Sequence, residues 1–219
     1  MHNTEYLKRN ALGFEGDNFI ATKLEQLIKE FNIKTVVETG TYLGYTTKRF
    51  ASMVDEVYTV EINPEYFNKA VQHVIALPNV FMRNNDSPSM LNETLPLIKD
   101  NTLLFLDAHW GNNCPLIDEL NIIGKFKNKP VIAIHDFKVP GRADLGFDSY
   151  NGQDFTYEWV KPYLDAIYGG ENNYTIEYNN EAEGAKRGII YITPKVILEE
   201  LIEPKKKAGR PKGSKNKEK

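Results

Sequence analysis

The 219-residue chain has a single cysteine, Cys114. One cysteine cannot form a disulfide within the chain, and it cannot supply the several thiolates of a structural zinc site. No apolar run approaches the roughly 20 residues that a membrane-spanning helix needs. The first ten residues, MHNTEYLKRN, lack the apolar core of a signal peptide. From these absences we expect a soluble protein of a reducing compartment, with no membrane contact and a cytoplasmic location.

Charge is divided unevenly along the chain. Residues 204–219 contain eight lysine or arginine residues and one glutamate, a net charge of +7. The other residues have a net charge of −10, although the formal charge of the whole chain is only −3. An acidic body repels phosphates, so any binding to a polyanion is expected in the tail. Length and a hydrophobic content of 41% suit one domain, 1–203, followed by a disordered basic tail, 204–219.

Hydrophobic periodicity predicts an alternation of helices and strands. A helix over 17–31 precedes strands over 35–38, 57–60, 80–83, 103–106 and 131–134, and helices over 45–53, 65–75, 87–98, 115–125 and 155–168 follow them in turn. Two further β runs, 174–178 and 188–192, are separated by polar residues and are typical of an antiparallel hairpin. Five βα units closed by a hairpin predict the α/β class, with a doubly wound, seven-stranded, mostly parallel sheet.

The end of the first predicted strand carries the most informative pattern. It reads Glu38-Thr39-Gly40-Thr41-Tyr42-Leu43-Gly44-Tyr45-Thr46-Thr47, and Glu61 ends the next strand. A strand-end acid such as Glu61 suits a ribose diol. A dinucleotide site needs a third glycine, and a carboxylate just before the first glycine would repel a pyrophosphate. The pattern therefore favours binding of a nucleoside with a cationic or amine-bearing group. The alternative is a strand-turn-helix without a ligand, in which Glu61 is only a capping or solvated residue.

This pattern resembles motif I of the class I S-adenosylmethionine-dependent methyltransferases, E/D-x-G-x-x-x-G. The resemblance covers about 17–194 and implies their Rossmann-like fold. It also implies that the cofactor, S-adenosylmethionine, is bound at the first four strand ends, by Glu38, Gly40, Thr41, Tyr42, Gly44, Thr46, Glu61, Ile62, Asp86, Ser87 and Asp107. In the family the loop after the third strand contacts the adenine. Asp86 and Ser87 in that loop are equally typical of a helix N-cap before Pro88, and the two roles are compatible.

Polar side chains follow the fourth and fifth predicted strands. Asp107, His109 and Trp110 come after the fourth strand, and His135 and Asp136 after the fifth. Because the carboxyl ends of parallel strands meet at one edge of a sheet, these groups are expected to lie together. We expect Asp107, His135 and Asp136 to hold Mg²⁺, Mn²⁺ or another divalent metal. The alternative is that the histidines satisfy buried carbonyls and Asp107 caps the next helix.

The spacing of these groups resembles that of metal-dependent small-molecule O-methyltransferases of the catechol and macrolide-sugar types, whose acidic ligands follow strands four and five. Asp107 and His135 are 28 residues apart, as in that family. His135 replaces a carboxylate, which leaves a softer metal or a metal-free site open. The catechol enzymes have a lysine that acts as general base at the position of Trp110. In this chain His109 is the available base, with Asp107 beside it. The resemblance implies in-line methyl transfer from the sulfonium to a hydroxyl.

Motifs for methylating a nucleic-acid base are absent. Enzymes that methylate base amines have Asn/Asp-Pro-Pro-aromatic after strand four, and cytosine C5 enzymes need a Pro-Cys nucleophile, whereas Cys114-Pro115 has the reverse order. A small-molecule or sugar hydroxyl is therefore the expected acceptor. We expect it to contact Arg142 and Tyr150 of the long segment 140–158 and to stack on Trp110. A surface lid without contacts is the alternative for this segment.

The tail resembles an AT-hook, because lysines flank its core Gly209-Arg210-Pro211. In AT-hooks this core lies in the narrow minor groove of A·T-rich DNA, which implies DNA contacts by Arg210 and Lys212. A solubilising tail, nonspecific polyanion binding or nuclear localisation suits the same residues. Two functions therefore stay open: an S-adenosylmethionine-dependent O-methyltransferase, and a DNA-associated protein on a methyltransferase-like scaffold. The sequence does not indicate an oligomeric state.

Overall fold

The computed structural model describes residues 11–109 and 113–195. The elements are η1 (Phe14–Gly16), α2 (Asn18–Glu30), β1 (Thr35–Thr39), α3 (Tyr45–Ala51), β2 (Glu56–Glu61), α4 (Pro64–Val74), β3 (Val80–Asn84), α5 (Ser87–Thr94), η2 (Leu95–Leu97), β4 (Thr102–Leu106), α6 (Leu116–Ile123), β5 (Val131–His135), β6 (Ser149–Tyr150), β7 (Gln153–Asp154), α7 (Tyr157–Tyr168), η3 (Glu171–Asn173), β8 (Tyr174–Tyr178) and β9 (Ile189–Pro194). The domain boundary expected at 203 lies outside the described residues, as do Trp110, Arg210 and Lys212.

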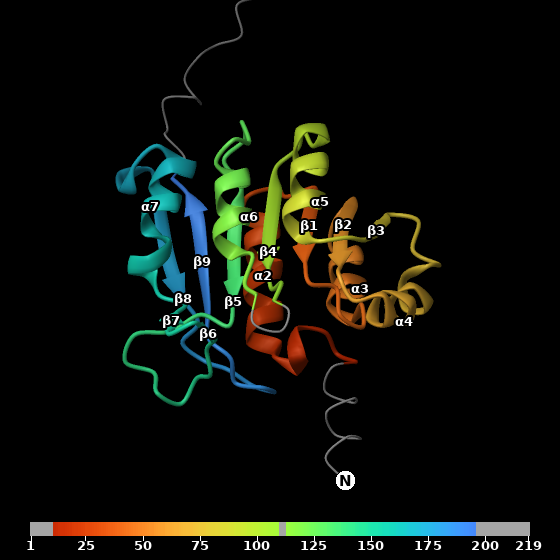
Figure 1. Cartoon of the computed structure of the whole chain (residues 1–219), viewed down its shortest axis with the longest axis horizontal. Coiled ribbons are helices and arrows are strands. Elements are labelled where there is room, and N and C mark those ends of the chain that lie inside the picture. The colour runs from red at the N-terminus through yellow and green to blue at the C-terminus, as the bar shows by residue number, and fades with distance from the viewer. Residues whose placement is uncertain (1–10, 110–112, 196–219) are drawn as a thin grey trace, which may run out of the picture.

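Seven strands form one sheet in the order β3-β2-β1-β4-β5-β9-β8 (Figure 1). Strands β1 to β5 pair in parallel, whereas β9 is antiparallel to both β5 and β8, so β9 alone is reversed. The doubly wound, mostly parallel sheet predicted from the sequence is therefore confirmed. The chain proceeds from β1 to β3 in one direction and resumes at β4 on the other side of β1. This places the switch point, where such sheets bind ligands, between β1 and β4.

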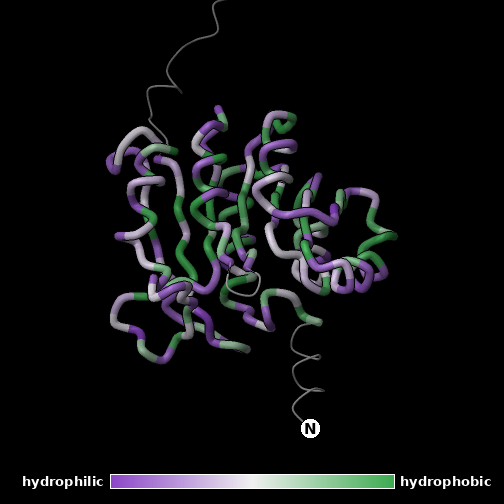
Figure 2. Tube along the Cα trace, in the orientation of Figure 1, coloured by the Kyte–Doolittle hydropathy of each residue, from purple (hydrophilic) through white to green (hydrophobic). Residues whose placement is uncertain are grey.

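Each face of the sheet has its own apolar core, because successive side chains of a strand point to opposite faces. Val37, Leu104 and Ile132 belong to the core that α5, α6 and α7 cover. Their neighbours on the same strands, among them Val36 and Phe105, belong to the core that α2 and α3 cover. Figure 2 shows the sheet as a hydrophobic interior between more hydrophilic helices. Burial on both faces explains why these strands are continuous apolar runs.

Capping side chains fix where several helices begin. Asp17 Oδ1 accepts hydrogen bonds from the backbone N–H groups of Phe19 and Ile20 at 2.9 and 3.0 Å, which starts α2. The helix predicted over 87–98 ends at Thr94 and continues as the 3-10 turn η2. Pro96 has no N–H to continue an α-helix, which is the physical reason. Within the part of the chain that the structure describes, no helix is both long and apolar enough to cross a membrane.

The long segment 140–158 contains a hairpin that the periodicity does not predict. Strands β6 and β7 pair antiparallel around Asn151 and Gly152, whose φ angles are 52° and 80°. Positive φ at both central residues is the requirement of the tight hairpin turn that Asn-Gly favours. The two-residue strands are too short to show alternation, so only this dipeptide signals the hairpin.

Candidate active site

A cleft of about 500 Å³ lies at the carboxyl ends of the parallel strands, at the lower edge of the sheet in Figure 1. It spans the switch point, because its walls come from the ends of β1, β2, β4 and β5 and from η1. Nine of the predicted site residues line it: Gly40, Thr41, Tyr42, Thr46, Glu61, Ile62, Asp107, His109 and Asp136. The structure thus brings together residues that are nearly one hundred positions apart in the sequence.

The two glycines of the β1 loop have different roles. Gly40 has φ +87°, and a Cβ at this position would lie 2.5 Å from the carbonyl oxygen of Asp107, so only glycine lets β1 and β4 end this close together. Gly44 has φ +79° and precedes α3, and its hypothetical Cβ would lie 3.2 Å from Val74. Gly40 lines the cleft, whereas Gly44 serves the packing of α3 on α4.

Glu61 ties the β1 loop to the end of β2. Its Oε2 accepts a hydrogen bond from the backbone N–H of Tyr42 at 2.7 Å, and its Oε1 accepts one from Asn63 at 2.8 Å. Each carboxylate oxygen can accept more than one hydrogen bond, so both remain able to accept from ligand hydroxyls. The largely buried Glu61 therefore fixes the shape of the loop and presents acceptors to the cleft.

Glu38 lies beneath the loop and does not line the cleft. Its Oε2 accepts hydrogen bonds from the hydroxyls of Thr47 and, at 2.7 Å, Thr59, whereas Oε1 has no partner. Burial raises the pKa of Glu38 to about 8, against the hydrogen bonds from the two threonines. In this structure the side chain supports the loop from inside, in contrast to the direct contact expected from the sequence.

The two polar residues after β3 lie in different surroundings. Asp86 Oδ1 accepts from the backbone N–H of Ser89 at 2.8 Å and caps α5. Ser87 is buried and lines a small recess of about 30 Å³ together with Ile62 and His109. Asp86 is therefore used by the helix, and the buried hydroxyl of Ser87 lies beside the carboxyl group of Glu119.

The ends of β4 and β5 bring two aspartates and two histidines together. His109 is about half exposed, and its Nε2 lies 3.9 Å from Asp136 Oδ2. His135 is buried, with its Nδ1 3.2 Å from Asp107 Oδ1 and 3.3 Å from Asp136 Oδ1. The atoms close enough to share a cation, within 4.8 Å of one another, belong to Asp107, His109 and Asp136. The predicted ligand set is corrected accordingly, because His135 is enclosed between the two carboxylates and His109 faces the cleft.

The carboxylates of Asp107 and Asp136 and the buried imidazole of His135 stabilise one another's charged forms at the wall of the cleft. Burial lowers the pKa of His135, but the charges of Asp107 and Asp136 outweigh burial and hold that pKa well above its ordinary value. Burial raises the pKa of Asp136, but His135 and Arg187 outweigh it and hold that pKa well below its usual range. Asp136 also has a φ of 57°, an uncommon conformation for a non-glycine residue. The contacts of the Asp136 side chain with His135 and Arg187 therefore offset the cost of this backbone conformation.

Arg187 is a member of this group that the sequence patterns missed. Its Nε donates to Asp136 Oδ1, and its Nη2 donates to Asp148 Oδ1. The topology could have indicated it, since a residue just before the reversed strand β9 arrives at the carboxyl edge of the parallel strands. The spacing of Asp107, His109 and Asp136 fits a divalent ion, but the charge does not fit, because a fixed cation already pairs with Asp136.

Glu15 is the second missed residue. Gly13, Phe14, Glu15 and Gly16 all have positive φ, and this left-handed run turns Glu15 into the cleft. The backbone N–H of Phe14 donates to Thr46 Oγ1 at 2.9 Å, which fastens the run to α3. Burial raises the pKa of Glu15, whereas the charge of His135 lowers it. The glycines that flank Phe14-Glu15 were the available signal.

The residues expected to bind the acceptor are separated by the structure. The ring centroids of Tyr150 and His109 are 6.3 Å apart, and the Tyr150 hydroxyl donates to Asp148 Oδ2 at 3.3 Å. Arg142 instead pairs with Asp144, with Nη2 2.7 Å from Oδ2, and does not line the cleft.

Burial raises the pKa of the Cys114 thiol to about 11, which opposes a role as nucleophile.

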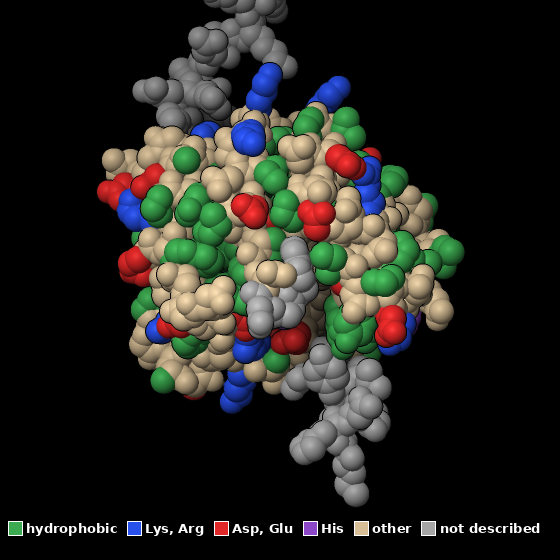
Figure 3. Space-filling model, viewed as in Figure 1, with side chains coloured by type: hydrophobic (Ala, Val, Ile, Leu, Met, Phe, Trp, Pro, Cys, Tyr) green, Lys and Arg blue, Asp and Glu red, His purple; other side chains and the backbone are tan. Residues whose placement is uncertain are grey.

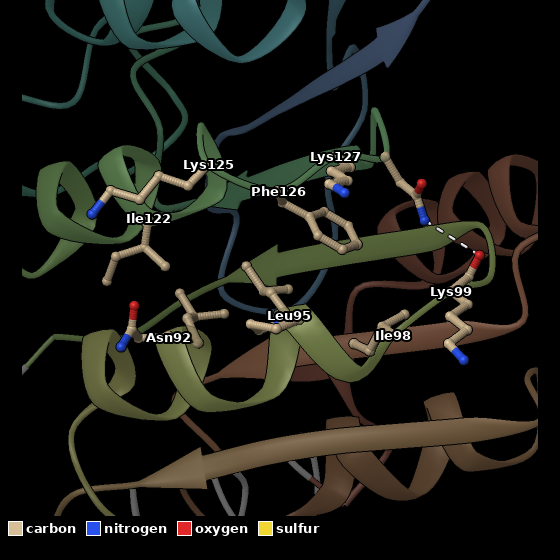
Figure 4. A pocket seen from close by; sticks show the side chains of 11 residues that line it. Asn92, Leu95, Ile98, Lys99, Ile122, Lys125, Phe126 and Lys127 are labelled. Carbon is tan, nitrogen blue, oxygen red and sulfur yellow. Dashed lines mark hydrogen bonds between the residues drawn. The ribbon is translucent and has the colours of Figure 1, made fainter.

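A second hollow of about 500 Å³ lies at the opposite edge of the sheet, between α5, η2 and the end of α6. Figure 4 shows Leu95, Ile98 and Phe126 at its centre and the amino groups of Lys99 and Lys125 directed away from it. Figure 3 shows lysine or arginine side chains along the upper edge of this face. None of the predicted site residues lines this hollow.

Known proteins share this architecture, although no family model matches the chain. Catechol O-methyltransferase B of Danio rerio is 26% identical over 152 residues, and the match covers 65% of this chain and 57% of that relative. The O-methyltransferase TomG of Streptomyces achromogenes, solved with S-adenosylmethionine, superposes with a TM-score of 0.58 at 16% identity, over 80% of this chain and 78% of TomG. An O-methyltransferase of Bacillus cereus, solved with S-adenosylhomocysteine, gives 0.55 at 18% identity over 80% of each chain. The chain therefore has the fold of the S-adenosylmethionine-dependent O-methyltransferases.

Proposed function

We propose that this protein is an S-adenosylmethionine-dependent methyltransferase that acts on a hydroxyl of a small-molecule or sugar acceptor. One observation carries the proposal: the β1 loop tied by Glu61 and the charged groups after β4 and β5 open into the same cleft. The three similar proteins are O-methyltransferases, which supports the same assignment. The chain spans 57% of the length of the catechol O-methyltransferase, and the assignment rests on the residues of the cleft.

The lining of the cleft suits this cofactor. Four of its lining residues are acidic, Glu15, Glu61, Asp107 and Asp136, and none is lysine or arginine. S-adenosylmethionine carries a sulfonium and an ammonium group, which carboxylates attract, whereas a dinucleotide carries phosphates that they repel. Glu61 offers acceptors to the ribose hydroxyls, and Ile62 offers an apolar surface to the adenine beside Ser87.

His109 is the residue we assign as general base. It lines the cleft, and a histidine can take a proton near neutral pH. The acceptor hydroxyl gives its proton to His109 while its oxygen attacks the methyl carbon and the carbon–sulfur bond breaks, leaving S-adenosylhomocysteine. Asp136, 3.9 Å from His109 Nε2, stabilises the imidazolium that forms. The cleft contributes by holding oxygen, carbon and sulfur in line.

We assign the acceptor to the side of the cleft near Tyr150, whose ring centroid lies 6.3 Å from that of His109. An aromatic side chain there suits a planar or sugar ring. The DNA-associated alternative depends on 204–219, which lie outside the described residues. The proposal therefore concerns the body of the protein alone.

Calorimetric titration of the full chain with S-adenosylhomocysteine tests the cofactor assignment. We expect Glu61→Gln to weaken binding about tenfold or more, because the neutral amide no longer accepts equally from Tyr42 N–H and ribose. Glu65→Gln, an exposed acid at the start of α4, is the matched control and should bind as the wild type does. No binding at millimolar S-adenosylmethionine or S-adenosylhomocysteine would end the proposal. Release of S-adenosylhomocysteine with a panel of catechols and sugars then identifies the acceptor class.

A further inference from the structure

Arg187 holds a fixed positive charge inside the group of carboxylates. It lies two residues before β9 and bridges Asp136, at the end of β5, to Asp148, in the segment before β6. The side chains of Asp136 and Asp148 are 10% and 20% exposed, so neither ion pair is a surface contact. A guanidinium stays charged at every pH at which the protein is folded. The charge is therefore a permanent part of the site.

The backbone around Arg187 holds the side chain in place. Gly146 N–H donates to the carbonyl of Lys186, and Gly188 N–H donates to the carbonyl of Gly146, both at 2.8 Å. A Cβ on Gly146 would lie 2.7 Å from Arg187 Nη1 and 3.2 Å from its Cδ, so a side chain at position 146 would displace the guanidinium from this place. Asp148 N–H donates in turn to the carbonyl of Asp136 at 2.8 Å. Two loops and a strand end thus orient the arginine before any ligand binds.

The same contacts engage one oxygen of each of the two carboxylates that a cation would share. Asp136 Oδ1 accepts from Arg187 and also lies 3.3 Å from His135 Nδ1. Asp107 Oδ1 lies 3.2 Å from the same nitrogen, His135 Nδ1. A divalent ion shared by Asp107, His109 and Asp136 would compete for Asp136 with a guanidinium that cannot give up its charge.

We propose that Arg187 is the resident cation of this site, that it excludes divalent metals from Asp107, His109 and Asp136, and that it positions Asp136 beside His109. If the protein is a methyltransferase as proposed above, this inference makes the reaction independent of an added metal, and to that extent it rests on the proposed function. The exclusion of divalent metals does not depend on the proposed function, because metal affinity is measured without cofactor. Arg187 is a positioning residue, since it acts through Asp136.

Titration of the full chain with Mn²⁺, followed by the electron paramagnetic resonance signal of the free ion, tests the proposal. We expect the wild type to bind Mn²⁺ only at millimolar concentrations. Arg187→Met should bind it at least about tenfold more tightly, because one positive charge leaves the site. Adding Asp107→Asn to Arg187→Met should abolish the gain, which locates the ion. Arg83→Met, which removes an arginine paired with Glu93 on the surface, is the matched control and should behave as the wild type does.

Two results would overturn the proposal. One is micromolar Mn²⁺ binding by the wild type that Asp107→Asn removes, and the other is an Arg187→Met variant that folds and binds no better than the wild type. If Arg187→Met does not fold, the comparison of wild type with Asp107→Asn still decides. Arg187→Lys, which keeps the charge and loses the two-pronged contact, should stay weak for Mn²⁺. Binding of S-adenosylhomocysteine is scored separately, so failure of the cofactor assignment is distinguishable from failure of this inference.

Discussion

Two concave regions of the described surface, the cleft and the hollow, have the same volume of about 500 Å³ and opposite chemistry. The cleft contains four acidic residues and a histidine and no lysine or arginine, whereas the hollow contains three lysines, Lys99, Lys125 and Lys127, and no acidic residue. The hollow is floored by leucine, isoleucine and phenylalanine side chains of the core (Figure 4). Size alone would not separate these two regions.

The topology explains the difference. At the carboxyl edge, consecutive parallel strands stop side by side, and the residue after each strand faces the same space. This edge collects Glu61, Asp107 and Asp136 from three strands. At the amino edge the chain arrives from helices, and the hollow is the gap left between α5 and α6 above the core. Convergent polar groups, rather than concavity, therefore mark the site.

The largest expected effect concerns His109, the proposed general base. His109→Ala should lower turnover about 10²- to 10⁴-fold, because the acceptor proton then has no positioned acceptor. Affinity for S-adenosylhomocysteine should change much less, since the side chain acts on the acceptor. Rates of S-adenosylhomocysteine formation under saturating cofactor measure the effect. An unchanged rate would remove His109 from the mechanism.

The second effect concerns the closeness of β1 and β4. Gly40→Ala should lower the free energy of unfolding by about 2–4 kcal/mol and weaken cofactor binding, because the new Cβ meets backbone and φ is positive. Gly152→Ala is the matched control, since its φ is +80° and nothing lies within 4 Å of the new Cβ. Chemical denaturation compares the two variants. Equal losses would mean that the conformation, and not the contact with Asp107, requires glycine at position 40.

The third effect is a pH dependence of stability. Glu38 has an ordinary pKa of 4.5 and, by burial, a pKa of about 8 in the folded protein. Between these values the unfolded chain has lost a proton that the folded chain keeps, so stability falls as pH rises, by at most about 1.4 kcal/mol per pH unit. Glu38→Gln should remove that part of the decline between pH 5 and pH 8.

Urea denaturation at several pH values measures this change, with the exposed Glu65→Gln as the control that should keep the wild-type decline. Glu119, also buried, has a pKa raised to about 7 by burial, and Glu119→Gln should remove a smaller part of the decline over a narrower window. A decline identical in all variants would show that Glu38 is ionised in the folded protein.

The smallest effect is expected at the hollow. Lys125→Ala combined with Lys127→Ala removes two exposed side chains from its rim. Affinity for S-adenosylhomocysteine should stay within about twofold, and the free energy of unfolding within about 0.5 kcal/mol. A tenfold loss of cofactor affinity would mean that the two regions are coupled, and the comparison between them would fail.

Much of the fold follows from local sequence. The apolar β-branched runs and the polar residues after each strand predict the elements and the edge where ligands bind. In the structure, Asp17 and Asn63 cap α2 and α4. Element ends differ by a few residues where Pro96 or Thr156 changes the local geometry. The glycine loop and Glu61 were found because their spacing in the sequence reflects their spacing around one turn and one neighbouring strand.

Hydrophobic periodicity does not indicate how the remaining site residues are arranged. Glu15 reaches the cleft through a left-handed run that no periodicity signals, and Arg187 reaches Asp136 because β9 is reversed. The choice between His109 and His135 depends on which imidazole the two carboxylates enclose. Arg142, prominent in the sequence, is paired with Asp144 instead.

By itself, the sequence determined the α/β class, the order of elements and the strand ends that carry chemistry, because periodicity and turn residues act within a few positions. Only the tertiary structure decided which of those groups share one cleft, that Glu38 lies beneath it, and that a fixed arginine pairs with Asp136. The physical reason is the difference in range along the sequence between these interactions. Hydrogen bonds and caps are local, whereas the Coulomb energy among Asp107, His135, Asp136 and Arg187 depends on distances that only the packed sheet defines.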